Sequence, residues 1–290
     1  MLSHTEASRT VSTGSRPRKD QLALHPKHRL RLGSWNYRAG ISTPERQQLV
    51  CQAAQRYSID ILAVQEAALQ RDVFCGGYRI LASPPAQNSN QQRSARNSGV
   101  ALVLSRAATA ALQRWEVISP RILVATFHGP VVNTVVIAAY APHSGLGRLE
   151  TQQFRDQLHA AISDVAPRHF LVVLGDFNAR VGSACSSSAA DSYGGALGRH
   201  GVGERNTEGR KLLDLCAATK LSVANTFFQH RPAHKLSFRS SRNQEHLLDF
   251  VLVRRKFLNS VRDVRVLRGA NGCGEPSKGR PWSPPSHLYM

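Results

Sequence analysis

Residues 29–64 constrain the fold most, because they read as strand, helix and strand in succession. Leu30 and Leu32 alternate with polar residues up to Trp35, as in a half-buried strand. Thr43-Pro44-Glu45 has the composition of a helix start, and the apolar residues after it recur at helical spacing (Leu49, Val50, Ala53, Ala54 and Tyr57). Residues 59–64 then form an apolar strand pattern. This order predicts an α/β layer.

The rest of the chain adds strands and two further helices. Residues 78–81, 99–104, 122–127 and 131–140 are β-rich with short links, which predicts an antiparallel meander. Helices are predicted over 149–165 and from a cap at Thr207, and a central strand over 170–174. Further strands are expected at 221–226, 235–239, 247–253 and 261–267. We expect one domain over 29–270, a disordered basic arm over 1–28 and an unstructured tail over 271–290.

Composition narrows the classes of function. The chain has 290 residues and a formal net charge of +19, and residues 199–268 hold fifteen Lys or Arg against six Asp or Glu. Such an excess favours a polyanionic partner such as nucleic acid. No apolar run is long enough for a transmembrane helix, and residues 1–20 lack the apolar centre of a secretory signal. Five widely spaced cysteines fit a reducing compartment, so we expect an intracellular protein, nuclear or cytoplasmic, without membrane contact.

Polar residues stand where several predicted strands end. They are Asn36, Glu66, Asp176 and Asn178, with Asp249 inside an apolar strand. Carboxylates such as Glu66 suit Mg²⁺, an aspartate can act as general base, and an amide can orient water or donate to a phosphoryl oxygen. Taken singly, each of these residues more often has an ordinary structural role. Gly175-Asp176-Phe177-Asn178 alone fits an Asx-turn, Glu66 an exposed acid at a strand end, and Asn36 a turn residue. Asp249 is different, because a buried carboxylate needs a partner.

In chain order, seven motifs resemble the metal-dependent endonuclease/exonuclease/phosphatase superfamily, and within it the endonuclease domains of non-LTR retrotransposons and their craniofacial-development-protein-like relatives. The motifs are Gly33-Ser34-Trp35-Asn36, Val64-Gln65-Glu66, Ser98-Gly99-Val100-Ala101, Ala139-Tyr140-Ala141-Pro142, Leu174-Gly175-Asp176-Phe177-Asn178-Ala179, residues 200–206 and residues 248–253. The resemblance implies a DNase I-like four-layer α/β/β/α sandwich and phosphodiester hydrolysis by an in-line water. It also implies Mg²⁺ as cofactor, with Mn²⁺ as a substitute, and duplex DNA as partner of a monomer.

The resemblance also implies a role for each matched residue. Asn36 and Glu66 would hold the metal, Tyr140 would lie beside the phosphate, Asp176 would activate water and Asn178 would steady the developing charge. Asp249 matches the acid that orients a catalytic histidine. We further expect basic and loop residues to face DNA, namely Arg205, Asn206, Arg239, Arg254 and Arg255.

The chain departs from the family pattern in two places. The family ends with a strand carrying Ser-Asp-His, whereas residues 274–282 here read Gly-Glu-Pro-Ser-Lys-Gly-Arg-Pro-Trp, and Ser286-His287 comes later among prolines. Ser237-Phe238 stands where relatives have Thr-Trp. We therefore expect the C-terminal strand to be missing and nicking to be impaired. The alternatives are a degenerate nucleic-acid-binding protein and, less favoured by the charge, a lipid or inositol phosphatase on the same fold. Phosphate-loop and dinucleotide-binding motifs are absent from the sequence.

Overall fold

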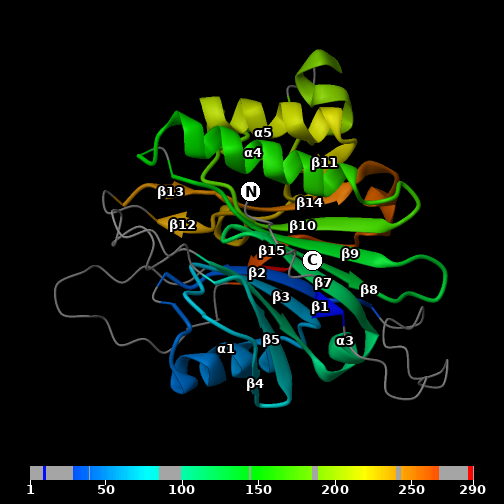
Figure 1. Ribbon diagram of the computed structural model, residues 1–290. Coiled ribbons are helices and arrows are strands. Elements are labelled where there is room, and N and C mark those ends of the chain that lie inside the picture. The colour runs from blue at the N-terminus through cyan, green and yellow to red at the C-terminus, as the bar shows by residue number, and fades with distance from the viewer. Residues whose placement is uncertain are drawn as a thin grey trace, which may run out of the picture.

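Two sheets lie face to face between outer helices in the computed structural model (Figure 1). The structure describes residues 9–10, 29–38, 40–84, 99–143, 145–184, 189–239, 243–267 and 287–289. Sheet A has the strand order β1-β7-β8-β9-β10-β14-β11, sheet B has the order β15-β16-β2-β3-β6-β5-β4, and β12 pairs with β13 in a separate ribbon. The predicted four-layer sandwich is therefore confirmed.

The strands of sheet A are Arg9–Thr10 (β1), Leu112–Ser119 (β7), Ile122–Phe127 (β8), Thr134–Tyr140 (β9), Phe170–Asp176 (β10), Asp249–Arg254 (β14) and Leu221–Val223 (β11). Those of sheet B are Arg265–Leu267 (β15), His287–Tyr289 (β16), Leu32–Asn36 (β2), Ile61–Gln65 (β3), Val100–Leu104 (β6), Tyr78–Ala82 (β5) and Val73–Cys75 (β4). The ribbon joins Phe238–Arg239 (β12) to Glu245–His246 (β13). Short 3-10 turns occupy Ala189–Gly195, Ala224–Thr226, Pro232–His234 and Arg255–Ser260.

Helix α1 (Pro44–Arg56) covers sheet B, and α4 (Arg148–Ser163) and α5 (Thr207–Ala218) cover sheet A (Figure 1). As the sequence predicted, Thr43 caps α1, since its side chain accepts a hydrogen bond from the backbone N–H of Arg46. The start of α5 differs by one residue from the prediction. Asn206, not Thr207, is the N-cap, because its Oδ1 accepts from the backbone N–H of Gly209 at 2.8 Å.

The core between the sheets is built by strict alternation. Leu32 and Ile61 from sheet B meet Val136, Val172 and Val251 from sheet A, and all five are buried. The next residues along β9 and β10, such as Ile137 and Val173, point the other way, under α4 and α5. Strands β9 and β10 are thus apolar on both faces, which explains their uninterrupted hydrophobic sequence.

The predicted meander over 78–140 is split between two sheets. β5 and β6 pair within sheet B, and the chain then crosses through α3 (Arg106–Ala111) to β7, β8 and β9 of sheet A. Helix α3 and strand β7 were not predicted. Alternation identifies a strand with one buried face, but it does not say which sheet buries that face.

Both ends of the chain contribute a strand. β16 lies antiparallel between β15 and β2, with Leu288 opposite Ser34 and Tyr289 opposite Gly33. The expectation that the C-terminal strand is missing and that 271–290 is wholly unstructured is therefore wrong at residues 287–289. In the N-terminal arm, Arg9–Thr10 pairs with β7, while the other residues before 29 lie outside the described part. Among the described residues, no helix is both long and apolar enough to cross a membrane.

Gly175 gives a test of this packing. It pairs with Ala139 of β9 one residue before Asp176, and a Cβ added there would lie 2.0 Å from the carbonyl oxygen of Ala139. Because backbone would have to move, we expect Gly175→Ala to lower the free energy of unfolding by about 1–3 kcal/mol. Urea unfolding checks this. Gly203→Ala, where the added Cβ meets nothing within 4 Å but φ is +69°, should cost only about 1 kcal/mol. Equal losses in both variants would contradict the packing argument.

Candidate active site

The predicted polar residues meet at one edge of the sandwich. Asn36 ends β2 and Glu66 follows β3, while Tyr140 ends β9 and Asp176 ends β10. The register places Asp176 beside Tyr140 on one side and beside Asp249, the first residue of β14, on the other. The strand ends of both sheets thus bring together five side chains that are far apart in sequence.

One amide group joins the two sheets. Asn36 Nδ2 donates to Glu66 Oε1 at 3.0 Å and to Asp176 Oδ2 at 2.9 Å. Tyr140 OH donates to the same Glu66 oxygen at 2.9 Å. The orientation of Asn36 is itself fixed, because its Oδ1 accepts from the backbone N–H of Arg38 at 3.0 Å. These hydrogen bonds connect Asn36, Glu66, Tyr140 and Asp176 in one network. The sequence predicted that these residues lie close together.

Asn178 supports Asp176 from the following turn. Its backbone N–H donates to Asp176 Oδ1 at 2.9 Å, and its Nδ2 donates to the carbonyl oxygen of Ala141 at 2.8 Å. This is the Asx-turn that the motif on its own suggested. The Asx-turn is therefore part of the site, because the backbone N–H of Asn178 that closes it lies next to Asp176.

Three residues at this edge adopt left-handed backbone conformations that non-glycine residues rarely adopt. Arg38 has φ of 56°, Glu66 of 55° and Asn178 of 47°. Such conformations cost on the order of 1 kcal/mol each and concentrate at functional sites. Glu66 and Asn178 come just after β3 and β10, and this backbone conformation keeps both residues close to the ends of those strands.

The two aspartates are buried next to each other. Burial raises the pKa of Asp176, while hydrogen bonds from Asn36 and from the backbone of Asn178 oppose that rise. Burial, and then the charge of Asp176, raise the pKa of Asp249 well above its ordinary value. Asp249 Oδ1 is buried and has no hydrogen-bond partner among the described residues. This edge therefore has negative charge that the described residues only partly neutralise.

Three residues at the site were not among the predicted site residues. Arg38 is exposed, and its charge lowers the pKa of both aspartates while its guanidinium lies 4.7 Å from the centroid of the Phe238 ring. Ser237 Oγ accepts from the backbone N–H of Asp249 at 3.2 Å and so anchors the start of β14. Arg121 lies 5.0 Å from the Tyr140 ring centroid and donates to the Tyr140 carbonyl at 3.3 Å. Only Ser237 had a signal, as a departure from the family pattern.

The residues predicted to contact nucleic acid mostly serve the fold. Arg254 is buried and donates to the carbonyls of Val165 and Ala166 at the end of α4, so its assignment to a DNA surface is wrong. Arg255 donates to the carbonyl of Leu221. Arg205 stacks on a tyrosine ring and donates to the carbonyl of Val181.

Asn206 is occupied as the cap of α5, and its Oδ1 also accepts from the backbone N–H of Arg180. Its Oδ1 therefore anchors the start of α5 to the strand-end loop at Arg180. Arg239 belongs to β12, but its side chain lies outside the described part.

The donor set at the edge fits a hard cation such as Mg²⁺. Within the described ranges, no group of three or more His, Cys, Asp or Glu is spaced to enclose a metal. Glu66 and Asp176 instead offer carboxylate oxygens on either side of the Asn36 amide. Mg²⁺ is commonly bound by only one or two carboxylates and keeps several waters. A cation here would also relieve the unfavourable charge of the buried aspartates.

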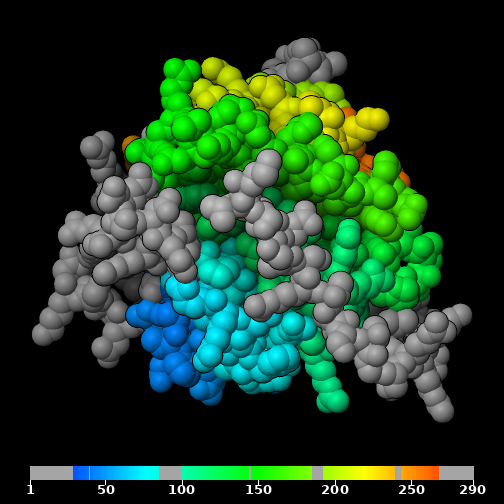
Figure 2. All heavy atoms as spheres, viewed as in Figure 1, coloured from blue at the N-terminus to red at the C-terminus, as the bar shows by residue number. Residues whose placement is uncertain are grey.

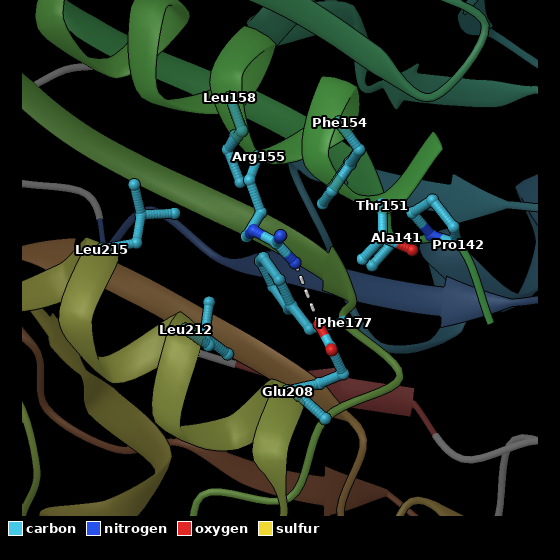
Figure 3. Close-up of a pocket in the computed structure, with 11 residues that line it drawn as sticks. Ala141, Pro142, Thr151, Phe154, Arg155, Leu158, Phe177, Glu208, Leu212 and Leu215 are labelled. Atoms are coloured by element: carbon cyan, nitrogen blue, oxygen red, sulfur yellow. Dashed lines mark hydrogen bonds and ion pairs between the residues drawn. The ribbon is translucent and has the colours of Figure 1, made fainter. Parts of the chain in front are cut away.

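A separate pocket lies between α4 and α5, on the outer side of sheet A (Figure 3). It encloses about 30 Å³, and an ion pair between Arg155 and Glu208 of 3.2 Å crosses it. Phe154, Leu158 and Leu212 line its apolar part. This volume holds a water or two, so we do not assign substrate binding to it.

Comparison with known proteins agrees with this geometry. The sequence model of the Endonuclease/Exonuclease/phosphatase family matches residues 33–277. The chain belongs to this family. Craniofacial development protein 2 of Bos taurus is 28% identical over 259 residues, which are 85% of this chain and 39% of that protein. The same protein of Tragulus javanicus is 29% identical over 262 residues, which are 85% of this chain and 41% of that protein. The chain thus spans less than half the length of these relatives.

Solved structures show the same fold as this family member. The endonuclease domain of TRAS1, a telomere-specific non-LTR retrotransposon, superposes with a TM-score of 0.58 at 14% identity, covering 90% of this chain and 97% of that domain. AP endonuclease LMAP from Leishmania major superposes with a TM-score of 0.64 at 16% identity, covering 97% and 92%. At these identities the likeness establishes the fold alone.

The burial of Asp249 predicts a stability effect. Because its pKa is raised in the folded state, the fold binds that proton more tightly than the unfolded chain does, and stability falls as the pH rises from about 4. Asp249→Asn removes this penalty. We expect the variant to gain about 1–3 kcal/mol over the unaltered chain at pH 8 in EDTA, and the gain to vanish near pH 4. Urea unfolding at both pH values measures it, and a gain that does not depend on pH would contradict the explanation.

Proposed function

We propose that this chain is a metal-dependent phosphodiesterase that cleaves nucleic acid, of the DNA-nicking endonuclease type. The observation that carries the proposal is the Asn36 amide, which joins Glu66 of one sheet to Asp176 of the other. Two carboxylates, one from each sheet, are thereby held a single side chain apart. This pairing supports hydrolysis better than it supports a purely structural role, because buried carboxylates are costly to keep.

The surroundings of each residue indicate its role in the proposed reaction. Glu66 would hold Mg²⁺, with Mn²⁺ as a substitute, and the ion would supply charge neutralisation at the phosphate when bound. Asn36 presents its Nδ2, a donor, to both acids, so it orients the Glu66 carboxylate in place of the expected metal contact. Asp176 takes the proton of the attacking water, and its raised pKa makes it a stronger base than an ordinary aspartate. Tyr140, whose hydroxyl is held by Glu66, and Asn178, held by the turn, line the place where the phosphate charge develops.

Charge supports a polynucleotide as substrate. The chain carries +19, and Arg38 is exposed beside the two aspartates. The names of the structural neighbours, an endonuclease domain and an AP endonuclease, point to DNA. A second candidate is a nucleic-acid-binding relative without turnover, which the departures after residue 273 favour. A lipid or inositol phosphatase on the same fold fits the charge less well.

Removal of either carboxylate tests the mechanism. We expect Glu66→Ala and Asp176→Ala to lower the rate of plasmid nicking by about 10²–10³-fold, because each loses an interaction made in the transition state. EDTA should abolish nicking, and Mg²⁺ or Mn²⁺ should restore it only in the unaltered chain.

Glu204→Ala is the control, since this acid lies on an exposed part of the 200–206 loop, away from the network. Nicking that persists in EDTA and in Asp176→Ala would refute the mechanism. Salt-sensitive DNA binding without any nicking by the unaltered chain would instead establish the binding protein without turnover.

Strand β16 bears on the expected impairment. It pairs with β2 and contacts β14, which begins at Asp249, but it does not carry the Ser-Asp-His sequence of the family. We therefore propose that the chain nicks DNA more slowly than relatives that have this motif. The reason is the absent acid and imidazole, and not an absent strand.

Restoring the motif tests this proposal. We expect a chain whose residues 274–290 are replaced by a β-strand carrying Ser-Asp-His to nick DNA about 10²-fold faster than the unaltered chain, because it regains an acid and an imidazole at the site. Equal nicking rates for the two chains would contradict the proposed impairment.

A further inference from the structure

Two thiols come together on the outer side of sheet B. Cys51 lies on the buried face of α1, and Cys75 ends the edge strand β4. Cys75 packs against the apolar cluster that contains Cys51. Helix α1 packs against β4, and Figure 2 shows the blue surface of α1 directly beside the cyan surface of the β4–β5 region. A Cβ built on the next residue, Gly76, would lie 3.7 Å from Cys51 Cβ, so the close approach involves the backbone as well.

The site does not use this pair. Neither cysteine belongs to the network around Asn36, and neither takes part in the proposed hydrolysis. The remaining described cysteine, Cys216, lies on the buried face of α5, over the other sheet and in a different cluster of apolar side chains. Cys185 and Cys273 lie outside the described residues.

We propose that Cys51 and Cys75 form a reversible disulfide when a hydroperoxide oxidises the protein, and that this bond ties α1 to β4. In the first step the thiol of one cysteine attacks the peroxide, forming a sulfenic acid and releasing water. In the second step the other thiol attacks the sulfenic sulfur, forming the S–S bond and releasing a second water. Two thiols are oxidised by two electrons in total, and one hydrogen peroxide is reduced to two waters.

The surroundings set the order of the steps. Cys75 is partly exposed, whereas Cys51 is 2% exposed. Burial and the neighbouring Cys75 raise the pKa of Cys51 to about 12, so Cys51 keeps its proton at neutral pH. Because peroxide reaches the more exposed thiol first, Cys75 is oxidised first and Cys51 resolves it.

The bond would close a ring that contains part of the site. Residues 51–75 include all of β3 and Glu66. A disulfide stabilises mainly by restricting the unfolded chain, and a ring of this length has a substantial effect. We expect the oxidised protein to melt about 5 °C or more above the reduced protein, with the segment from Glu66 to β4 held between two fixed ends.

The experiment uses the full chain with Cys185 and Cys273 replaced by serine. The folded protein is treated with hydrogen peroxide, the remaining thiols are blocked, and peptides are mapped by mass spectrometry without reduction. We expect a 51–75 cross-link that dithiothreitol reverses, together with the rise in melting temperature. Cys75→Ser and Cys51→Ala should abolish both, and Cys216→Ser should abolish neither.

Three outcomes would overturn the proposal. The first is the absence of the 51–75 cross-link in folded protein. The second is a cross-link to Cys216 in comparable yield, which would reflect unfolding. The third is a cross-link that leaves the melting temperature unchanged or lower. Cys75→Ser keeps the test valid even if Cys51→Ala fails to fold, because Cys75 is not in the fully buried core.

Discussion

The Asn36 amide is the contact on which the candidate site depends, because its two hydrogens bind acids that belong to different sheets. Glu66 follows β3 of sheet B, and Asp176 ends β10 of sheet A. Their separation is therefore set by how the two sheets pack and not by any local loop. The apolar layer between the sheets, with Val172 and Ile61 at its centre, thus fixes the distance between the reacting groups.

The same packing of the sheets places two carboxylates in the interior, where a charged group is unfavourable. Asp176 and Asp249 are direct neighbours across β10 and β14, and both are buried. Burial raises the pKa of each, and the charge of Asp176 raises the pKa of Asp249 further. Ser237, Asn36 and Arg38 offset part of this cost through hydrogen bonds and charge. The packing of the surrounding apolar core offsets the rest of this cost. Such a balance is typical of functional sites, where residues placed for chemistry lower the stability of the fold.

The sequence predicted most of the elements and the order of the site residues, because alternation and strand-end polarity are local signals. It did not predict contacts that exist only after packing. Arg121 lies in the turn between β7 and β8, where no pattern distinguishes it, yet it lies against Tyr140 once β8 and β9 pair. β16 escaped prediction because three residues without periodicity suffice as a strand when β2 and β15 provide backbone partners on both sides.

Positive charge in the sequence did not reveal which cations face a substrate. The run Arg254-Arg255-Lys256 suggests an exposed patch, but Arg254 ends β14, is buried, and donates to the carbonyls of Val165 and Ala166 just after α4. Arg38, a single basic residue two positions after Asn36, lies instead beside the two acids. The position of a charge relative to the strand ends, and not its density along the chain, therefore decides whether it can serve binding.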